Sequence, residues 1–292
     1  MTDGSRRSFL RGISAATAGS IALSAPVTAT GSETGSDAGA GDGSSATVER
    51  VSVGEVRRIG EGQISTFASM TASGEPTRVG VHFSPGALAG LPQAAAFERG
   101  DVDGKRLHGF WSLPLPLALP DAAPPPFAFV GAAWNPGGHT PEGVYDRPHF
   151  DLHFYFREPE VIGDIESGVV ESLPPETVPE GYELIEGGAV VPGMGAHLAP
   201  ADAPEFDDEE WHETLIWGVA DVDGGDAREL HFVEPMVTVD FLETHLDGVH
   251  SEPVAQPAVY PHDGCYPTTY AIHDLGDAGY AVTLADFEER SA

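Results

Sequence analysis

The 292-residue chain carries 46 acidic and 14 basic residues, for a formal net charge of −32, and only one basic residue, Lys105, is a lysine. Such a surface repels phosphate backbones and anionic lipids, which excludes nucleic acid as a partner. Because 41% of the residues are hydrophobic, the chain is not a disordered acidic polymer, and its charge predicts a halophilic protein, since concentrated salt screens the self-repulsion.

The first residues carry the features of an export signal. Residues 5–10 read S-R-R-S-F-L, and a short apolar stretch rich in small residues follows as far as Val27. Paired arginines before such a stretch are typical of a twin-arginine signal peptide, and the stretch is too short to span a bilayer. We therefore predict a signal peptide over residues 1–29, secretion by the twin-arginine route and no membrane insertion.

The remainder of the chain divides by composition. Residues 30–48 are rich in Gly, Ser and acidic residues and are predicted to form a flexible linker. Residues 49–292 are predicted to form a single β-rich domain. The only cysteine, Cys265, excludes an intramolecular disulfide.

Alternating apolar and polar residues predict most of the strands. The predicted ranges are 64–72, 77–83, 127–134, 149–156, 214–219, 230–233, 270–274 and 280–284. Short helices are predicted over residues 93–99 and 239–246, and the acidic residues 202–213 are predicted to form a solvated loop. Together these elements predict a mainly β protein, a sandwich or distorted barrel with one or two short helices.

The predicted strand over residues 149–156 carries an unusual polar face. His149, Asp151, His153 and Tyr155 fall on one side of it, and only apolar residues fall on the other. The apolar side belongs in a core. Packing does not explain two imidazoles, a carboxylate and a phenol in one row, so this face is the place where we expect chemistry.

Two further histidines lie near this face in the sequence. His139 stands in the Pro/Gly-rich loop before the strand, and His197 lies in the segment G-M-G-A-H. Imidazole and carboxylate groups that converge from a strand and two loops suit a divalent ion, Zn²⁺ first and Cu²⁺, Ni²⁺ or Mn²⁺ otherwise. His149 and His153 are about 13 Å apart on a straight strand, so both can bind one ion only if a bulge intervenes at His149; His153 is the preferred ligand.

Glu234 is the second candidate for chemistry. It stands among apolar residues in L-H-F-V-E-P-M-V-T, where an ionised carboxylate is costly unless it is paired or coordinates an ion. It could act as a further ligand or as a general base. It could equally accept backbone hydrogen bonds at a bulge forced by Pro235. If the site is catalytic, Glu234 and Tyr155 are the proton-transfer candidates.

These candidate residues lie in four motifs that follow one another along the sequence. They read W-N-P-x-G-H-x-P, P-H-F-D-x-H-F-Y, M-G-x-H and E-P-M-V-T. With them, residues 51–287 resemble a family of exported bacterial and archaeal proteins, catalogued as a domain of unknown function, whose type structure comes from a thermophilic bacterium. The resemblance implies a secreted β-rich domain with a cation site at the positions that match the motifs, namely His139, His149, Asp151, His153, His197 and Glu234.

Two hypotheses for the function follow. The first is a secreted domain that binds a divalent metal ion through the histidine cluster and acts as a metal-dependent hydrolase or lyase, with the ion activating water. The second is a non-enzymatic envelope or stress protein, in which the histidine cluster orders the core or supports a homo-oligomer.

Overall fold

The computed structural model describes residues 49–292, apart from residues 108, 208 and 223–227. The predicted signal peptide and linker, residues 1–48, lie outside the described residues. The described residues belong to one compact unit. No helix among them is long and apolar enough to cross a membrane.

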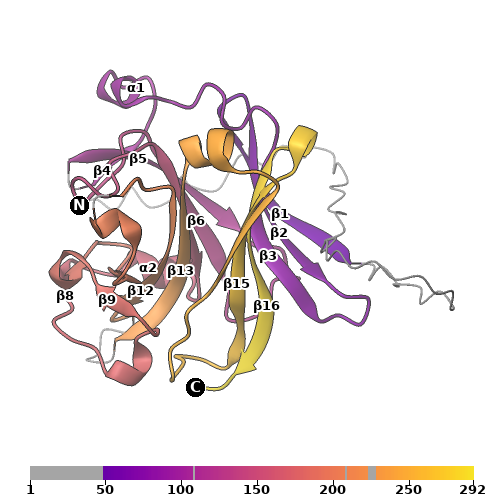
Figure 1. Cartoon of the computed structure of the whole chain (residues 1–292), viewed down its shortest axis with the longest axis vertical. Helices are drawn as coiled ribbons and strands as arrows, with labels where there is room; N and C mark the ends of the chain where they lie inside the picture. Colours follow the sequence, from indigo (N-terminus) through magenta and orange to yellow (C-terminus); the bar gives the residue numbers. More distant parts are fainter. Residues whose placement is uncertain (1–48, 108, 208, 223–227) are drawn as a thin grey trace, which may run out of the picture. The chain divides into compact units, whose positions relative to one another are not determined.

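Two antiparallel sheets contain most of the strands (Figure 1). The first sheet has six strands in the order β1-β2-β3-β16-β15-β14. Their bounds are Arg50–Ile59, Gly62–Met70, Pro76–Phe83, Tyr280–Arg290, Gly264–Asp274 and Val249–Pro253. The second sheet has eight strands in the order β4-β5-β6-β7-β13-β12-β11-β9. Their bounds are Lys105–Leu107, Phe110–Ala118, Phe129–Asn135, His149–Tyr155, Glu229–Thr238, Glu213–Ala220, Ala196–Pro200 and Tyr182–Leu184.

The remaining elements are short. β8 (Gly168–Val169) pairs with β10 (Ala189–Val190). The α-helices are α1 (Ala94–Glu98) and α2 (Pro159–Gly163), and a π-helix, η4, spans Phe241–His245. Single 3₁₀ turns occur at Pro175–Thr177, Glu186–Gly188, Pro204–Asp207 and Gly276–Ala278. The mainly β architecture is confirmed as a sandwich, and the strands of the described residues do not close into a barrel.

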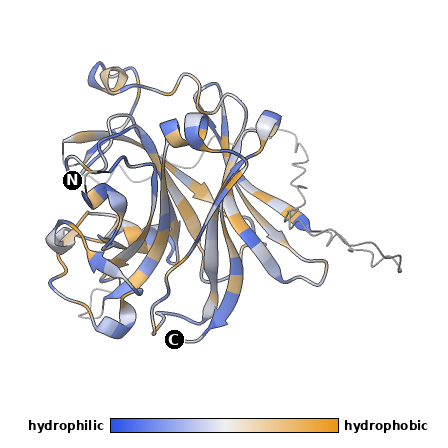
Figure 2. Ribbon diagram, in the orientation of Figure 1, coloured by the Kyte–Doolittle hydropathy of each residue, from blue (hydrophilic) through white to orange (hydrophobic). Residues whose placement is uncertain are grey.

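A hydrophobic core joins the two sheets. Phe83 on β3 packs against Phe150 on β7, with ring centroids 4.9 Å apart. Leu152 and Phe154 alternate with the polar residues of β7 and are fully buried on the same side as Phe150. Figure 2 shows this mixture of hydrophobic and hydrophilic residues along the strands. Each such burial stabilises the fold by roughly 1.5–3 kcal/mol.

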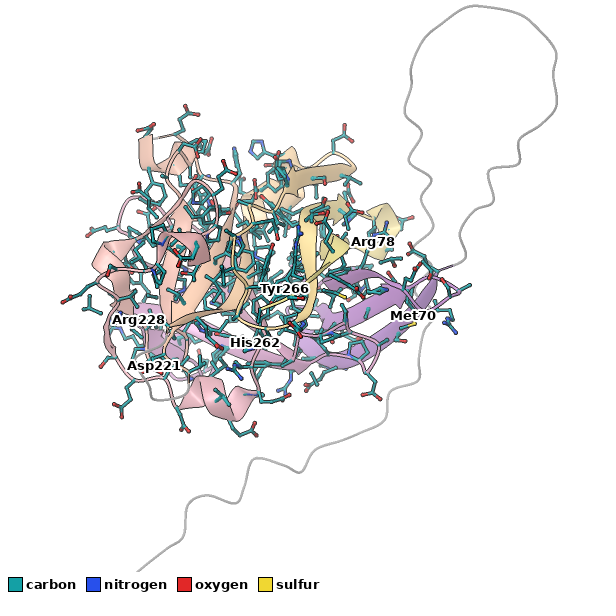
Figure 3. The ribbon with its side chains drawn as sticks, turned by 90° about the horizontal axis from the view of Figure 1, so that it is seen from below. Met70, Arg78, Asp221, Arg228, His262 and Tyr266 are labelled. Carbon is teal, nitrogen blue, oxygen red and sulfur yellow. The ribbon has the colours of Figure 1, made fainter. Side chains whose placement is uncertain are left out.

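A polar contact also links the sheets near the start of β13. His262, in the chain just before β15, places Nε2 3.2 Å from Oε1 of Glu229 on β13. Tyr266 donates its hydroxyl proton to the carbonyl oxygen of His262 at 3.1 Å (Figure 3). Arg157 binds the same Glu229 carboxylate at 2.7 Å. These contacts fix the beginning of the strand that carries Glu234.

The predicted strands all appear, as β2, β3, β6, β7, β12, β13, β15 and β16. β5 is among those that sequence alternation did not predict, because it contains Pro114 and Pro116. β4 pairs only with residues 110–112 of β5. At the two prolines β5 therefore pairs with β6 alone. Its other edge has no partner strand there that would need the N–H groups that proline lacks.

Candidate metal centre

The polar face of β7 is the outer face of the second sheet. β7 pairs with β6 and β13 without a register shift, so residues 149–155 alternate between the two faces as predicted. His149, Asp151, His153 and Tyr155 are between 0 and 5% exposed. An outer face buried this deeply needs a cover of its own, and a second apolar cluster, formed partly by loop residues, supplies it.

Part of this cover comes from Glu205 and Trp211, which lie in the segment 202–213. Most of the described residues of this segment are exposed, as predicted for a solvated loop, but these two are not. Glu205 and Trp211 are only 6% and 3% exposed. Trp211 donates from Nε1 to the Thr214 hydroxyl at 2.9 Å, and Thr214 donates to the Glu205 carboxylate. The Trp211 ring packs edge-on against His149, with centroids 4.8 Å apart. The acidic segment thus covers part of the histidine face, because the Trp211 ring is buried against His149.

The four predicted histidine ligands fall into two groups, each with one carboxylate. In each group, one potential ligand atom per residue lies within 4.8 Å of the others. The loop group consists of His139, His149 and Asp151, and the strand group consists of His153, His197 and Glu234. His149 and His153 therefore belong to different groups, as the spacing on a straight strand requires. The bulge considered at His149 does not occur.

The loop group is held around Asp151. Nε2 of His149 lies 2.9 Å from Oδ1 of Asp151, and Nε2 of His139 lies 3.4 Å from Oδ2. Asn135, at the end of β6, donates to Oδ2 at 2.7 Å and lies 3.2 Å from Nε2 of His149. Sequence reasoning missed Asn135. The available signal was its place in the W-N-P motif, where a polar residue ends an apolar strand.

The strand group forms across two paired strands. The register of β7 and β13 places Glu234 directly opposite His153. Nε2 of His153 lies 3.2 Å from Oε1 of Glu234, and Nε2 of His197, on β11, lies 3.8 Å from Oε2. The bulge predicted at Pro235 is wrong, because β13 keeps one register with β7 and with β12 on both sides of this proline.

Three of the histidines have the same tautomer. Nδ1 of His139, His149 and His153 lies 2.6, 2.6 and 3.1 Å from the carbonyl oxygens of residues 140, 147 and 131. A carbonyl oxygen only accepts, so Nδ1 carries the proton, and a neutral ring keeps a lone pair on Nε2. Each of these lone pairs faces a carboxylate oxygen, and that of His149 can also accept a hydrogen bond from the Asn135 amide. For His139 and His153, two acceptors in that position repel each other unless a proton or a cation lies between them.

The spacing of these atoms suits a cation. Zn²⁺ bonds of about 2.0–2.2 Å at tetrahedral angles place a nitrogen and an oxygen ligand about 3.4 Å apart. Three of the four Nε2–oxygen distances in the two groups are 3.2, 3.4 and 3.8 Å. Asp151 Oδ1, His153 Nε2 and Glu234 Oε2 are buried and make no hydrogen bond. Buried polar atoms of this kind are costly unless something else satisfies them.

Burial disfavours charge on each member of the strand group in the absence of a cation. Burial lowers the pKa of His153 to about 4. Burial, together with the nearby His153, lowers the pKa of His197 to about 3. Burial and the Asp151 carboxylate raise the pKa of Glu234 well above its ordinary value. The two imidazoles are therefore neutral at neutral pH, and a proton in the strand group lies preferentially on the Glu234 carboxyl.

The loop group behaves differently. Burial raises the pKa of Asp151, but the imidazoles of His149 and His139 outweigh burial and hold this pKa well below its ordinary value. Burial lowers the pKa of His139, but the Asp151 carboxylate and its hydrogen bond outweigh burial and leave this pKa raised. When no cation is present, the loop group therefore favours a proton on His139 beside an ionised Asp151, whereas the strand group favours a proton on Glu234 beside neutral imidazoles.

One cavity of about 70 Å³ adjoins both groups. Each group contributes one histidine and one carboxylate to its wall, and these are His139 with Asp151 and His197 with Glu234. Most of the remaining wall is apolar. The volume is enough for a few water molecules, since one water needs about 10–15 Å³ of such space. Ions in the two groups would thus share one small compartment.

Tyr155 does not line this cavity. Its ring stacks on His153 with centroids 5.5 Å apart and planes 7° apart. Of the two predicted proton-transfer residues, only Glu234 borders the cavity.

Gly218 leaves room for the aromatic ring that packs against the strand group. A Cβ at Gly218 on β12 would lie 2.0 Å from the ring of Phe232, which packs against His153 and His197 at 4.8 and 5.5 Å. We expect Gly218→Ala to lower the free energy of unfolding by roughly 1–3 kcal/mol, because the ring must move. Denaturant unfolding in multimolar KCl measures this. Gly163→Ala, where a Cβ meets nothing within 4 Å, is the control, and equal stability of the two variants would contradict the expectation.

A third group of possible ligands lies at the surface. It consists of His212, Asp240 and His245, with ligand atoms again within 4.8 Å of one another. Asp240 and His245 are about half exposed, and although Nδ1 of His212 is buried without a hydrogen bond, two of the three possible ligands are therefore open to solvent.

Comparison of the chain with models of protein families, with curated proteins and with solved structures finds no match.

Proposed function

We propose that this protein binds two divalent metal ions, one in the loop group and one in the strand group. The observation that carries this proposal is the shared tautomer of His139, His149 and His153, with Nδ1 on a backbone carbonyl and Nε2 turned to a buried carboxylate. Histidines that bind metal are oriented in this way by a hydrogen bond from the other ring nitrogen.

The donor set supports zinc before other metals. Each group offers two imidazole nitrogens and one carboxylate, and neither offers sulfur. Three protein ligands with a fourth position open to solvent are typical of catalytic Zn²⁺ sites, and imidazole also suits Cu²⁺ and Ni²⁺. The cavity beside both groups is where the open positions would lie. A water molecule bound there would be activated for hydrolysis or for a hydration–elimination reaction.

In this proposal Glu234 is a ligand of the strand-group ion. Its oxygens lie 3.2 and 3.8 Å from two Nε2 atoms, which are ligand-to-ligand distances. Asn135 holds the Asp151 carboxylate and so positions a ligand of the loop group.

We also propose that the protein works outside the cell in concentrated salt, as a member of the exported family that its motifs resemble. The pair Arg6 and Arg7 and the net charge of −32 support this. The alternative is a non-enzymatic envelope protein in which the ions are structural. The small volume of the cavity, about 70 Å³, favours that alternative over a large substrate.

Metal analysis tests the proposal. We expect two divalent ions per chain in protein purified in multimolar KCl, and one ion per chain in His153→Ala and in Asp151→Asn. His82→Ala removes another buried imidazole, on the first sheet, whose Nε2 lies 2.8 Å from a backbone carbonyl, and it should keep both ions. His245→Ala, in the surface group, should keep both as well. Less than one ion per chain in the parent protein would overturn metal binding.

A further inference from the structure

We propose that the metal-loaded cavity binds a compact oxyanion whose two oxygens coordinate one ion each, so that the substrate class is a small carboxylate, carbonate or phosphate group. This inference rests on the proposed function. It starts from the charge of the loaded site and from the way that both groups face one cavity.

The loaded site would carry excess positive charge. Its histidines bind metal as neutral imidazoles, so two divalent ions and the carboxylates of Asp151 and Glu234 leave a net charge of about +2. Of the other residues in the cavity wall, only Glu186 has a charged side chain, and it is exposed at the rim. A net charge in a largely buried site is costly unless it is paired. The empty coordination positions therefore favour anions.

The spacing of the groups selects the kind of anion. Asp151 and His153 are two residues apart on one face of β7, which separates them by about 7 Å. The ions of two-metal sites usually lie about 3.5–4 Å apart, so ions at the spacing of these two residues would be too far apart to share a single hydroxide. An anion that offers two oxygens spans a longer gap, because each oxygen adds its own metal–oxygen bond of about 2.0–2.2 Å.

The volume and the wall of the cavity bear on the size of the bound anion. A cavity of about 70 Å³ accommodates the head of a small oxyanion. Ile185, Met194 and Ile216 form part of the apolar wall. These side chains offer no hydrogen bonds, so recognition falls to the ions. The anionic group of a substrate would bind in the cavity, and any larger part of the substrate would remain outside it.

Cobalt-substituted protein provides the test, because the visible absorption of Co²⁺ responds to its ligands. Acetate, bicarbonate and inorganic phosphate are titrated at constant, multimolar KCl, and the metal content of each sample is measured. We expect a saturable spectral change with one anion bound per two ions in the parent protein and in His82→Ala. Asp151→Asn, which keeps only the strand-group ion, should bind the same anions at least tenfold more weakly.

The outcomes separate the two proposals. Parent protein without bound cobalt would overturn the metal centre itself. Two cobalt ions with no saturable response to any of the three anions would overturn only the oxyanion site. An unchanged affinity in Asp151→Asn would show that one ion suffices, and this would also overturn the bridging role.

Discussion

Removal of the divalent ions with a chelator is expected to lower the melting temperature by about 8–16 °C for each ion. An ion present at a thousandfold excess over its dissociation constant contributes about 4 kcal/mol, and each kcal/mol shifts the melting temperature of a domain of this size by about 2–4 °C. The effect should be large because removal leaves His153 Nε2 and Glu234 Oε2 buried without hydrogen bonds. Circular dichroism melting in multimolar KCl, before and after chelation, measures it.

The reversibility of this loss is part of the expectation. Added Zn²⁺ should restore the melting temperature of the chelated parent. The double variant His153→Ala/Asp151→Asn lacks a ligand in each group, so chelator and Zn²⁺ should leave its melting temperature nearly unchanged. A parent protein that melts at one temperature with and without chelator would contradict tight ion binding in either group.

Glu234→Gln is expected to change the pH dependence of the metal-free protein. Burial and the Asp151 carboxylate raise the pKa of Glu234 in the folded state, so the folded chain keeps a proton that the unfolded chain releases. The free energy of unfolding of the chelated parent should therefore fall as pH rises from about 4.3 toward the raised pKa, by up to about 1.4 kcal/mol per pH unit. The glutamine cannot ionise, and this part of the slope should disappear in the variant.

Denaturant unfolding at several pH values, with chelator present, measures this slope. Burial also raises the pKa of Glu205, which lies outside both metal groups, so Glu205→Gln should remove a slope of the same sign. Only Glu234→Gln should also lose the strand-group ion. Equal slopes in the parent and Glu234→Gln would refute the raised pKa.

The polar face of β7 could be predicted from the sequence because side chains alternate on any regular strand. His149, Asp151 and His153 lie on the face where the alternation places them, and the 13 Å limit correctly separates the two histidines. The bulge predicted at Pro235 is absent. A proline in a strand predicts a bulge only if the ladder cannot continue past it, and β13 keeps its register with both neighbours on either side of Pro235; its register shift with β12 comes only at Gly218/Val219.

The cover of the site could not be predicted. Residues 202–213 are acidic and contain few apolar residues, so local composition predicts solvent exposure. Trp211 is buried because His149 and Thr214 lie beside it in the fold. His149 is distant from Trp211 in the sequence, and the composition of the segment carries no information about it.

The amino-acid sequence alone determined the mainly β architecture and the row of imidazole and carboxylate groups on one strand face, because both depend on a period of two residues. Only the tertiary structure decided that four histidines form two groups and not one. The register between β7 and β13 brings Glu234 opposite His153, and the pairing of β11 with β12 brings His197 to the same carboxylate. Strand register depends on the packing of whole sheets, so no local pattern specifies which histidine meets which carboxylate.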